Sequence, residues 1–183
     1  MKKVCIFLAT GFEECEALLV VDMLRRAKIE AVTASITGER TVVSSHNVPV
    51  VADALAEELD LAGFDVLVLP GGVPGTPNLK ASKLVCDALT AQYNAGKRVA
   101  AICAAPSVLA SLGMLEGKPA CVHQCFRDQM AGAVLQDELV VTSGNVTTAC
   151  GLGAGIAFGL ELVRLLADDA AADQIAHAIS YGC

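Results

Sequence analysis

A cysteine stands where a predicted buried strand passes directly into a predicted helix. The stretch Arg98–Pro106 begins as a short apolar run, which is typical of a strand buried on both faces. It continues into Pro106–Leu112, which predicts a helix with proline in its first turn. Cys103 lies at the bend, where the unpaired N–H groups and the dipole of the helix favour an anion. We therefore expect the Cys103 thiol to lose its proton more readily than a free cysteine and to act as a nucleophile.

Three acidic residues follow the first predicted strand. Glu13, Glu14 and Glu16 fall in the first turn of a predicted helix, where the helix dipole alone would favour acids. Glu13 and Glu16 are three residues apart and share a face, whereas Glu14 points elsewhere. A carboxyl turned inward beside Cys103 would be partly desolvated, and its pKa would rise. It could then donate a hydrogen bond to a thiolate or move protons in catalysis.

Two further segments could serve the same site. The Gly71-Gly72 pair can bring backbone N–H groups close to a ligand and form an oxyanion site, although it also suits an ordinary turn. His123 lies between Cys121 and Cys125, and on an extended segment the three side chains would share a face. Their spacing matches none of the usual structural zinc patterns, so we expect no metal there. We expect His123 to be a proton-transfer partner of Cys103.

The remaining pattern alternates strands with helices. Apolar runs predict buried strands and a strand hairpin, and three- and four-residue apolar spacing predicts helices. The strands are expected at 4–9, 31–36, 65–69, 98–102, 139–142 and 146–148, and the helices at 12–28, 82–94, 106–112, 153–167 and 169–179. We expect Asp169 to cap the last of these helices. A hairpin is expected at 41–51, a short helix or turn at 54–60, a strand at 120–122 and a short helix at 126–131. The segment Pro70–Pro77 is too rich in Gly and Pro for us to expect regular structure.

This alternation predicts an α/β fold with a mostly parallel sheet and helices on both faces. In such sheets, ligands bind beyond the carboxyl ends of the strands. The three glutamates, the glycine pair and Cys103 all follow predicted strands directly. We therefore expect these groups to meet at one edge of the sheet.

Length and composition narrow the possible classes of protein. The 183 residues predict a single domain over 1–183, and a net charge of −7 disfavours nucleic acid or an anionic membrane as the main partner. The longest uncharged stretch, Leu139–Leu160, is broken by polar residues and glycines, so we expect no membrane span. With no export signal recognised, we expect a cytoplasmic protein whose 8 cysteines are mostly buried thiols rather than a disulfide framework.

Three motifs together resemble the DJ-1/PfpI superfamily, especially its ThiJ/YajL branch. They are Gly11-Phe12-Glu13-Glu14-Cys15-Glu16, Leu69-Pro70-Gly71-Gly72 and Ala100-Ala101-Ile102-Cys103-Ala104-Ala105-Pro106. The similarity runs in order from Lys3 to about Leu166. The resemblance implies a flavodoxin-like three-layer sandwich, related to class I glutamine amidotransferases, with a nucleophile-elbow cysteine, and it implies a homodimer.

The resemblance also suggests roles for individual residues. It implies that Cys103 is the reactive cysteine, Glu16 its protonated partner and His123 the site histidine, with backbone donors at Gly72 and Ala104. The expected activity is a cofactor-free glyoxalase or deglycase that acts on methylglyoxal, a small 2-oxoaldehyde, or on its adducts. A non-enzymatic redox sensor or chaperone whose cysteine oxidises to sulfinate is the main alternative. A thiazole-phosphate biosynthesis role is less favoured.

The chain departs from the family pattern at a few positions. Peptidase members have His directly after the cysteine, whereas this chain has Ala104, which disfavours a peptidase or amidase. His46 stands where the family often has Arg. Cys150 stands where Arg or Gln is common in the family. These replacements predict altered anion contacts around the site.

Overall fold

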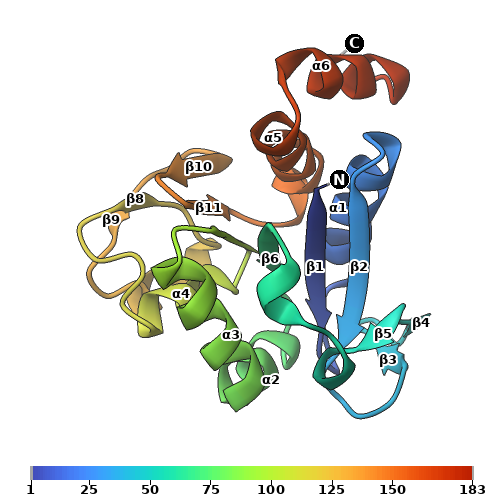
Figure 1. Ribbon diagram of the computed structural model, residues 1–183. Helices are drawn as coiled ribbons and strands as arrows, with labels where there is room; N and C mark the ends of the chain where they lie inside the picture. Colours follow the sequence, from blue (N-terminus) through green and yellow to red (C-terminus); the bar gives the residue numbers. More distant parts are fainter. Residues whose placement is uncertain (1, 183) are drawn as a thin grey trace.

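A seven-stranded sheet forms the centre of the molecule (Figure 1). The computed structural model describes residues 2–182. The sheet order is β10-β11-β7-β6-β1-β2-β5, and all neighbouring strands are parallel except β10 and β11. Its strands are β1 (Lys3–Leu8), β2 (Glu30–Ser35), β5 (Ala54–Leu55), β6 (Val66–Leu69), β7 (Arg98–Ile102), β10 (Val140–Ser143) and β11 (Val146–Ala149). The α/β, flavodoxin-like fold expected from the sequence is confirmed.

Helices cover both faces of this sheet. They are α1 (Glu14–Arg26), α2 (Gly75–Ala81), α3 (Lys83–Asn94), α4 (Pro106–Ser111), α5 (Gly155–Leu166) and α6 (Asp169–Ala178). On one face α1, α5 and α6 pack over Ile6 and its neighbours, and on the other α3 and α4 pack over Phe7. Because alternate residues of β1 enter these two cores, an unbroken apolar run is required there. This is the pattern from which the strand was predicted.

Smaller elements decorate the sheet. Two small sheets join β3 (Thr41–Val43) with β4 (Pro49–Val51) and β8 (Pro119–Ala120) with β9 (Val134–Leu135). The 3-10 turns are η1 (Ala56–Glu58), η2 (Leu61–Gly63), η3 (Gln124–Gln129) and η4 (Leu152–Ala154). No helix among residues 2–182 is long and apolar enough to cross a bilayer.

The structure corrects two local predictions. The Gly- and Pro-rich segment was expected to be irregular, yet α2 begins inside it at Gly75. Pro77 fits in the first helical turn because N–H groups there have no intrahelical acceptor. Asp168, rather than Asp169, caps α6 by accepting a hydrogen bond from the Ala171 N–H at 2.8 Å.

Candidate functional site

The carboxyl ends of β1, β6 and β7 bring together the groups expected to meet. These three strands are neighbours in the sheet. The N–H of Gly71, after β6, donates to Glu16 Oε2 at 2.9 Å. A Cβ on Gly71 would lie 2.6 Å from Glu16 Oε2 and 2.7 Å from the Cβ of Cys103. The carboxyl and the cysteine therefore leave no room for a side chain at Gly71, and only glycine fits there without a shift.

Cys103 occupies a strained backbone conformation. Its φ of 64° is in the left-handed region, which residues with a Cβ rarely adopt. Backbone hydrogen bonds hold it on both sides: its N–H donates to Ala149 O at 2.9 Å, and its carbonyl accepts from the His123 N–H at 2.9 Å. The elbow thereby turns the half-buried thiol off the sheet, where the N–H groups of Gly72 and Ala104 donate to it.

Glu16 is the buried acid that faces this thiol. Only 1% of its surface is exposed, and its carboxyl is in hydrogen-bonding contact with Cys103. Burial raises the pKa of Glu16 to about 7, and the nearby Glu13 adds to this, while the hydrogen bonds from Cys103 and Gly71 oppose it. A carboxyl with this pKa can both accept and release a proton near neutral pH.

The expected lowering of the thiol pKa is not found. Burial raises the pKa of Cys103 to about 12, and the charge of Glu16 is the next cause, against the smaller effects of the Ala104 and Gly72 N–H groups. Backbone N–H groups do donate to the sulfur and lower its pKa, but desolvation and the charge of the Glu16 carboxylate raise the pKa by more. Since one group ionises near 7 and the other near 12, the two behave as a coupled pair that carries one negative charge between these pH values.

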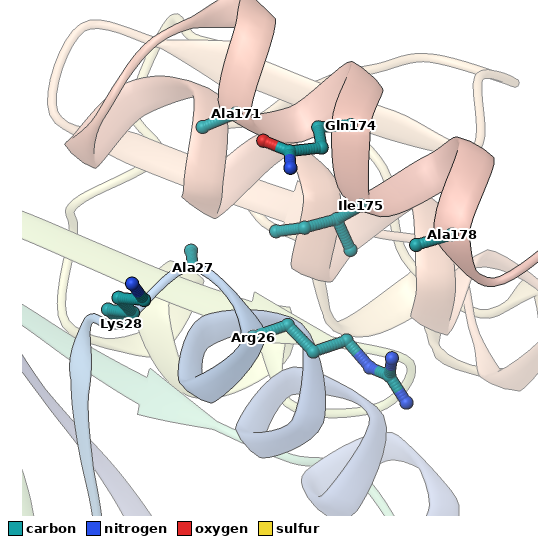
Figure 2. A pocket seen from close by; sticks show the side chains of 7 residues that line it. All are labelled: Arg26, Ala27, Lys28, Ala171, Gln174, Ile175 and Ala178. Carbon is teal, nitrogen blue, oxygen red and sulfur yellow. The ribbon is translucent and has the colours of Figure 1, made fainter.

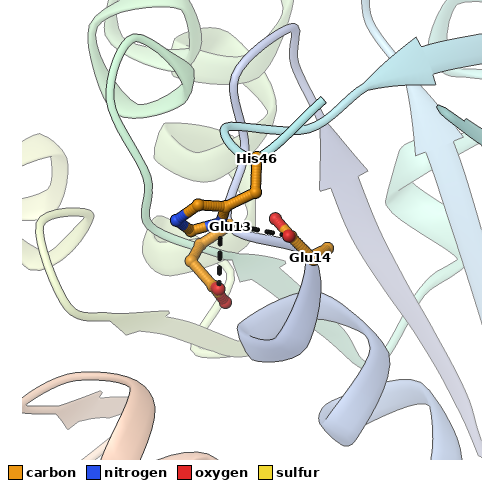
Figure 3. A group of neighbouring side chains, drawn as sticks. All are labelled: Glu13, Glu14 and His46. Atoms are coloured by element: carbon orange, nitrogen blue, oxygen red, sulfur yellow. Dashed lines mark hydrogen bonds and ion pairs between the residues drawn. The ribbon is translucent and has the colours of Figure 1, made fainter. Parts of the chain in front are cut away.

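Glu13 and Glu14 have different tasks from Glu16. Glu13 caps α1 by accepting a hydrogen bond from the Glu16 N–H at 2.6 Å, which fixes the turn that carries Glu16. Glu14 faces the loop after β3, where its Oε1 lies 3.0 Å from Nδ1 of His46 (Figure 3). Desolvation acts to raise the pKa of Glu14, but hydrogen bonds, including those from its own N–H, His46 and Ser44, together lower it. The expectation that Glu14 points away from the site is confirmed.

His123 reaches the site through its backbone. Its N–H binds the carbonyl of Cys103, while its Nδ1 accepts a hydrogen bond from the Cys125 N–H at 3.3 Å. Its ring lies against Gly151, where a Cβ would be 3.4 Å from His123 Cδ2. The structure therefore places His123 beside the elbow, with its backbone hydrogen-bonded to that of Cys103. His123 also lines a cavity of about 260 Å³, together with Cys150.

The cysteines flanking His123 do not join it as metal ligands. Cys121 is buried and Cys125 is exposed, so their side chains diverge. Within residues 2–182, the set of His, Cys, Asp and Glu groups that lies close enough for a metal is Glu13, Glu14 and His46, of which only His46 is exposed.

A larger hollow of about 470 Å³ lies away from the candidate site. It is between the end of α1 and α6, and Arg26, Ala27, Lys28, Ala171, Gln174, Ile175 and Ala178 line it (Figure 2). Neither a thiol nor a carboxyl faces it. It therefore does not bear on the chemistry of Cys103.

The structure gives Gly71 a different role from the one expected and gives His46 a partner that the sequence did not indicate. The N–H of Gly71 was expected to hold an oxyanion, but it is already taken by Glu16, so Gly71 positions the acid instead. The contact between His46 and Glu14 could not be predicted from the sequence, because the two residues are 32 positions apart and meet only through the fold. Gly72 and Ala104 remain the donors at the sulfur.

Comparisons with known proteins show the family of this chain. The family model described as "DJ-1/PfpI family" matches residues 2–165. Protein dj-1beta of Drosophila melanogaster is 35% identical over 177 residues, which cover 96% of this chain and 95% of that protein. The glutathione-independent glyoxalase DJR-1.2 of Caenorhabditis elegans is 30% identical over 156 residues, covering 84% of this chain and 82% of that protein.

Solved structures show the same fold over the full length. The C103A mutant of a DJ-1 superfamily protein from Salmonella typhimurium has a TM-score of 0.95 at 39% identity and covers 100% of both chains. Oxidized DJ-1 of Toxoplasma gondii has a TM-score of 0.96 at 34% identity, again with 100% of both chains covered.

Proposed function

Because this chain belongs to the DJ-1/PfpI family, we propose that it is a cysteine-dependent glyoxalase that converts methylglyoxal to lactate without glutathione or another cofactor. The contact between the buried Glu16 carboxyl and the Cys103 thiol is the observation that carries this proposal. A relative of 30% identity is named a glutathione-independent glyoxalase, which supports the same reaction.

The first step is addition of the thiol to the aldehyde. The sulfur of Cys103 attacks the aldehyde carbon of methylglyoxal and forms a C–S bond, and its proton passes to the Glu16 carboxylate. A pKa of about 7 suits Glu16 to this role, because about half of it is ionised at neutral pH. The developing oxyanion takes a proton, which gives a hemithioacetal. The N–H groups of Gly72 and Ala104 stabilise negative charge at this position.

The second step is an internal redox change. A base removes the hydrogen from the former aldehyde carbon to give an enediol, and a proton is returned to the neighbouring carbon. The former aldehyde carbon is thereby oxidised to a thioester, and the former ketone is reduced to an alcohol. Water then cleaves the C–S bond, releasing lactate and restoring the thiol. We assign the proton transfers to Glu16, whose carboxyl contacts the thiol, and to His123, whose backbone N–H binds the carbonyl of Cys103.

A deglycase activity would reach the same hemithioacetal by displacement: the Cys103 sulfur bonds to the carbinol carbon of an adduct, and the original thiol or amine leaves with a proton. Hemithioacetals and aminocarbinols formed by methylglyoxal on cysteine, lysine or arginine present the same three-carbon unit to Cys103. The half-buried position of the thiol and the adjoining cavity beside His123 leave space on one side of the elbow for a larger group.

The test of this proposal is lactate formation from methylglyoxal by the purified protein. Cys103→Ser should abolish turnover, and Glu16→Gln should lower it at least tenfold, since general catalysis contributes roughly 100- to 10,000-fold. Cys86→Ser, which alters a thiol on α3 away from the site, is the matched control. Equal rates for the wild type and Cys103→Ser would exclude the mechanism.

Redox sensing is the second candidate. The oxidized structure of the Toxoplasma gondii relative favours it, and so does an acid that can donate a hydrogen bond to an oxidised sulfur. In this case peroxide would convert Cys103 to a sulfinate, held by protonated Glu16. Intact-mass analysis after mild peroxide treatment should find a two-oxygen adduct at Cys103. Oxidation scattered over the other cysteines would count against this role.

We also propose that the protein is a cytoplasmic homodimer. Exposed apolar side chains support the dimer: Leu18 on α1, and Val43, Val48 and Val51 at the β3–β4 hairpin. The hairpin is fastened to the start of α1 by the Gly11 N–H, which donates to Val43 O at 2.8 Å. Leu18→Glu should therefore shift the protein towards monomer in sedimentation velocity.

A further inference from the structure

Two more cysteines lie next to the candidate site without taking part in the chemistry above. Cys121 follows β8, and Cys150 follows β11, the strand that pairs with β7. The register aligns Ala149 with Ile102, so Cys150 begins the turn at the same sheet edge as Cys103. Both residues are free thiols.

Backbone contacts bring Cys121 to the chain around Cys150. The Sγ of Cys121 lies 3.2 Å from Thr148 O and 3.7 Å from Leu139 O. Leu139 O also accepts the N–H of Cys150 at 3.0 Å. The sulfur of Cys121 therefore lies against two carbonyls that flank the backbone of Cys150. Consistent with this proximity, the charge of Cys150 contributes to raising the pKa of Cys121.

The two thiols differ in access to solvent. Cys150 is half-buried and lines the cavity of about 260 Å³ beside His123, so a small oxidant can reach it. Cys121 is only 1% exposed, and burial raises its pKa to about 11. Cys150 is therefore expected to react first, because a small oxidant reaches it more readily than it reaches the buried Cys121.

We propose that Cys121 and Cys150 form a peroxide-driven intramolecular disulfide beside the candidate site. The Cys150 thiolate attacks one oxygen of hydrogen peroxide, the O–O bond breaks, and a sulfenic acid and hydroxide result. The Cys121 sulfur then attacks this sulfur and displaces the hydroxyl group. With the thiol protons the net products are one disulfide and two waters, so two thiols lose two electrons to one peroxide.

The disulfide would link the segment that precedes His123 to the segment against which its ring lies. Cys121 is two residues before the histidine, and Gly151, against which the ring lies, directly follows Cys150. Oxidation would therefore fix the segment that carries His123 to the end of β11. Any effect of this on turnover rests on the proposed function, whereas formation of the bond does not.

Cleavage after glutamate makes the bond directly observable. It gives residues 59–116 with Cys86 and Cys103, residues 117–138 with Cys121 and Cys125, and residues 139–161 with Cys150 alone. Full-length Cys125→Ser protein is treated with a few equivalents of hydrogen peroxide, its remaining thiols are alkylated, and the non-reduced digest is analysed by mass spectrometry. The expected product is residues 117–138 joined to 139–161, with the loss of two hydrogens.

Variants separate this bond from the other thiol chemistry. Cys150→Ser, at a half-buried position, should abolish the cross-linked product, whereas Cys103→Ser should leave its yield unchanged even though glyoxalase activity is lost. Oxidised wild type should melt a few degrees higher than the reduced form, because the bond closes a loop in the unfolded chain, and Cys150→Ser should not. A digest in which 139–161 is joined to 59–116, or carries only sulfinate or an unoxidised thiol, would overturn the proposal.

Discussion

The coupling of Glu16 to Cys103 can be measured through the pH dependence of alkylation. Iodoacetamide reacts with thiolate, so its rate constant reports how much of the Cys103 sulfur is ionised. The peptide 59–116 also contains Cys86, so Cys86→Ser protein makes this peptide report on Cys103 alone. The perturbation is Glu16→Gln in that background, which removes the charge while keeping a side chain of similar size.

The wild-type curve should rise and then become flat. Below pH 7 the thiolate population grows tenfold for each pH unit. Near pH 7 the pair loses its first proton, since the pKa of Glu16 is about 7. The carboxylate then holds the proton on the sulfur until about pH 12. The rate constant should therefore level off just above pH 7 and rise again at higher pH, as the second proton begins to leave the pair.

Glu16→Gln should show no such plateau. Without the charge of Glu16, the pKa of Cys103 falls below about 12, while burial still holds it above the ordinary value of 9.0. The rate constant should thus continue to rise tenfold per unit beyond pH 7. Between pH 7 and pH 9 the ratio of variant to wild-type rate constants should grow, by up to about 100-fold, because the thiol of the variant continues to titrate while the wild-type rate levels off.

Glu14→Gln is the matched control for this experiment. It removes a carboxylate from the same helical turn, but one that faces His46, so it should keep the plateau. Parallel curves for the wild type and Glu16→Gln would refute the coupling. A wild-type rate that is already flat at pH 5 would also refute it, because the pair would then have lost its first proton well below pH 7.

Three further predictions concern stability and positioning. The pKa of Glu16 rises from 4.5 to about 7 on folding, so protonated Glu16 favours the folded state. This stabilisation, about 3 kcal/mol, is lost as the pH rises from 4.5 to 7. Urea unfolding should therefore find that Glu16→Gln gains stability relative to wild type as the pH rises from 4.5 to 7. Gly71→Ala would place a Cβ 2.6 Å from Glu16 Oε2, so it should lower the free energy of unfolding by about 1–3 kcal/mol in the same assay. It should also remove the plateau in Cys103 alkylation, and an unchanged plateau would contradict the positioning role of Gly71. Ser82 caps α3 by accepting from the Val85 N–H, so Ser82→Ala should lower stability by about 1 kcal/mol without changing Cys103 alkylation.

The sequence alone determined the architecture and the position of the nucleophile. Unbroken apolar runs such as that of β1 require burial on both faces, and their alternation with amphipathic helices leaves few arrangements besides a parallel sheet. In that arrangement the residues directly after β1, β6 and β7 share one edge. The meeting of the first-turn glutamates, Gly71 and Cys103 could therefore be predicted before any coordinates, and the resemblance to the family indicated Glu16 among the three acids.

Only the tertiary structure decided how these groups affect one another. The raised pKa of Cys103 depends on burial and on the facing carboxylate, which outweigh the local helix effect that the sequence indicated. The N–H of Gly71 donates a hydrogen bond to Glu16, 55 residues away in the chain. The sulfur of Cys121 contacts the carbonyl of Thr148, two residues before Cys150 and 27 residues away from Cys121. Ionisation, hydrogen-bond partners and thiol proximity are set by the distances and solvent access of groups far apart in the chain, and a sequence pattern contains neither.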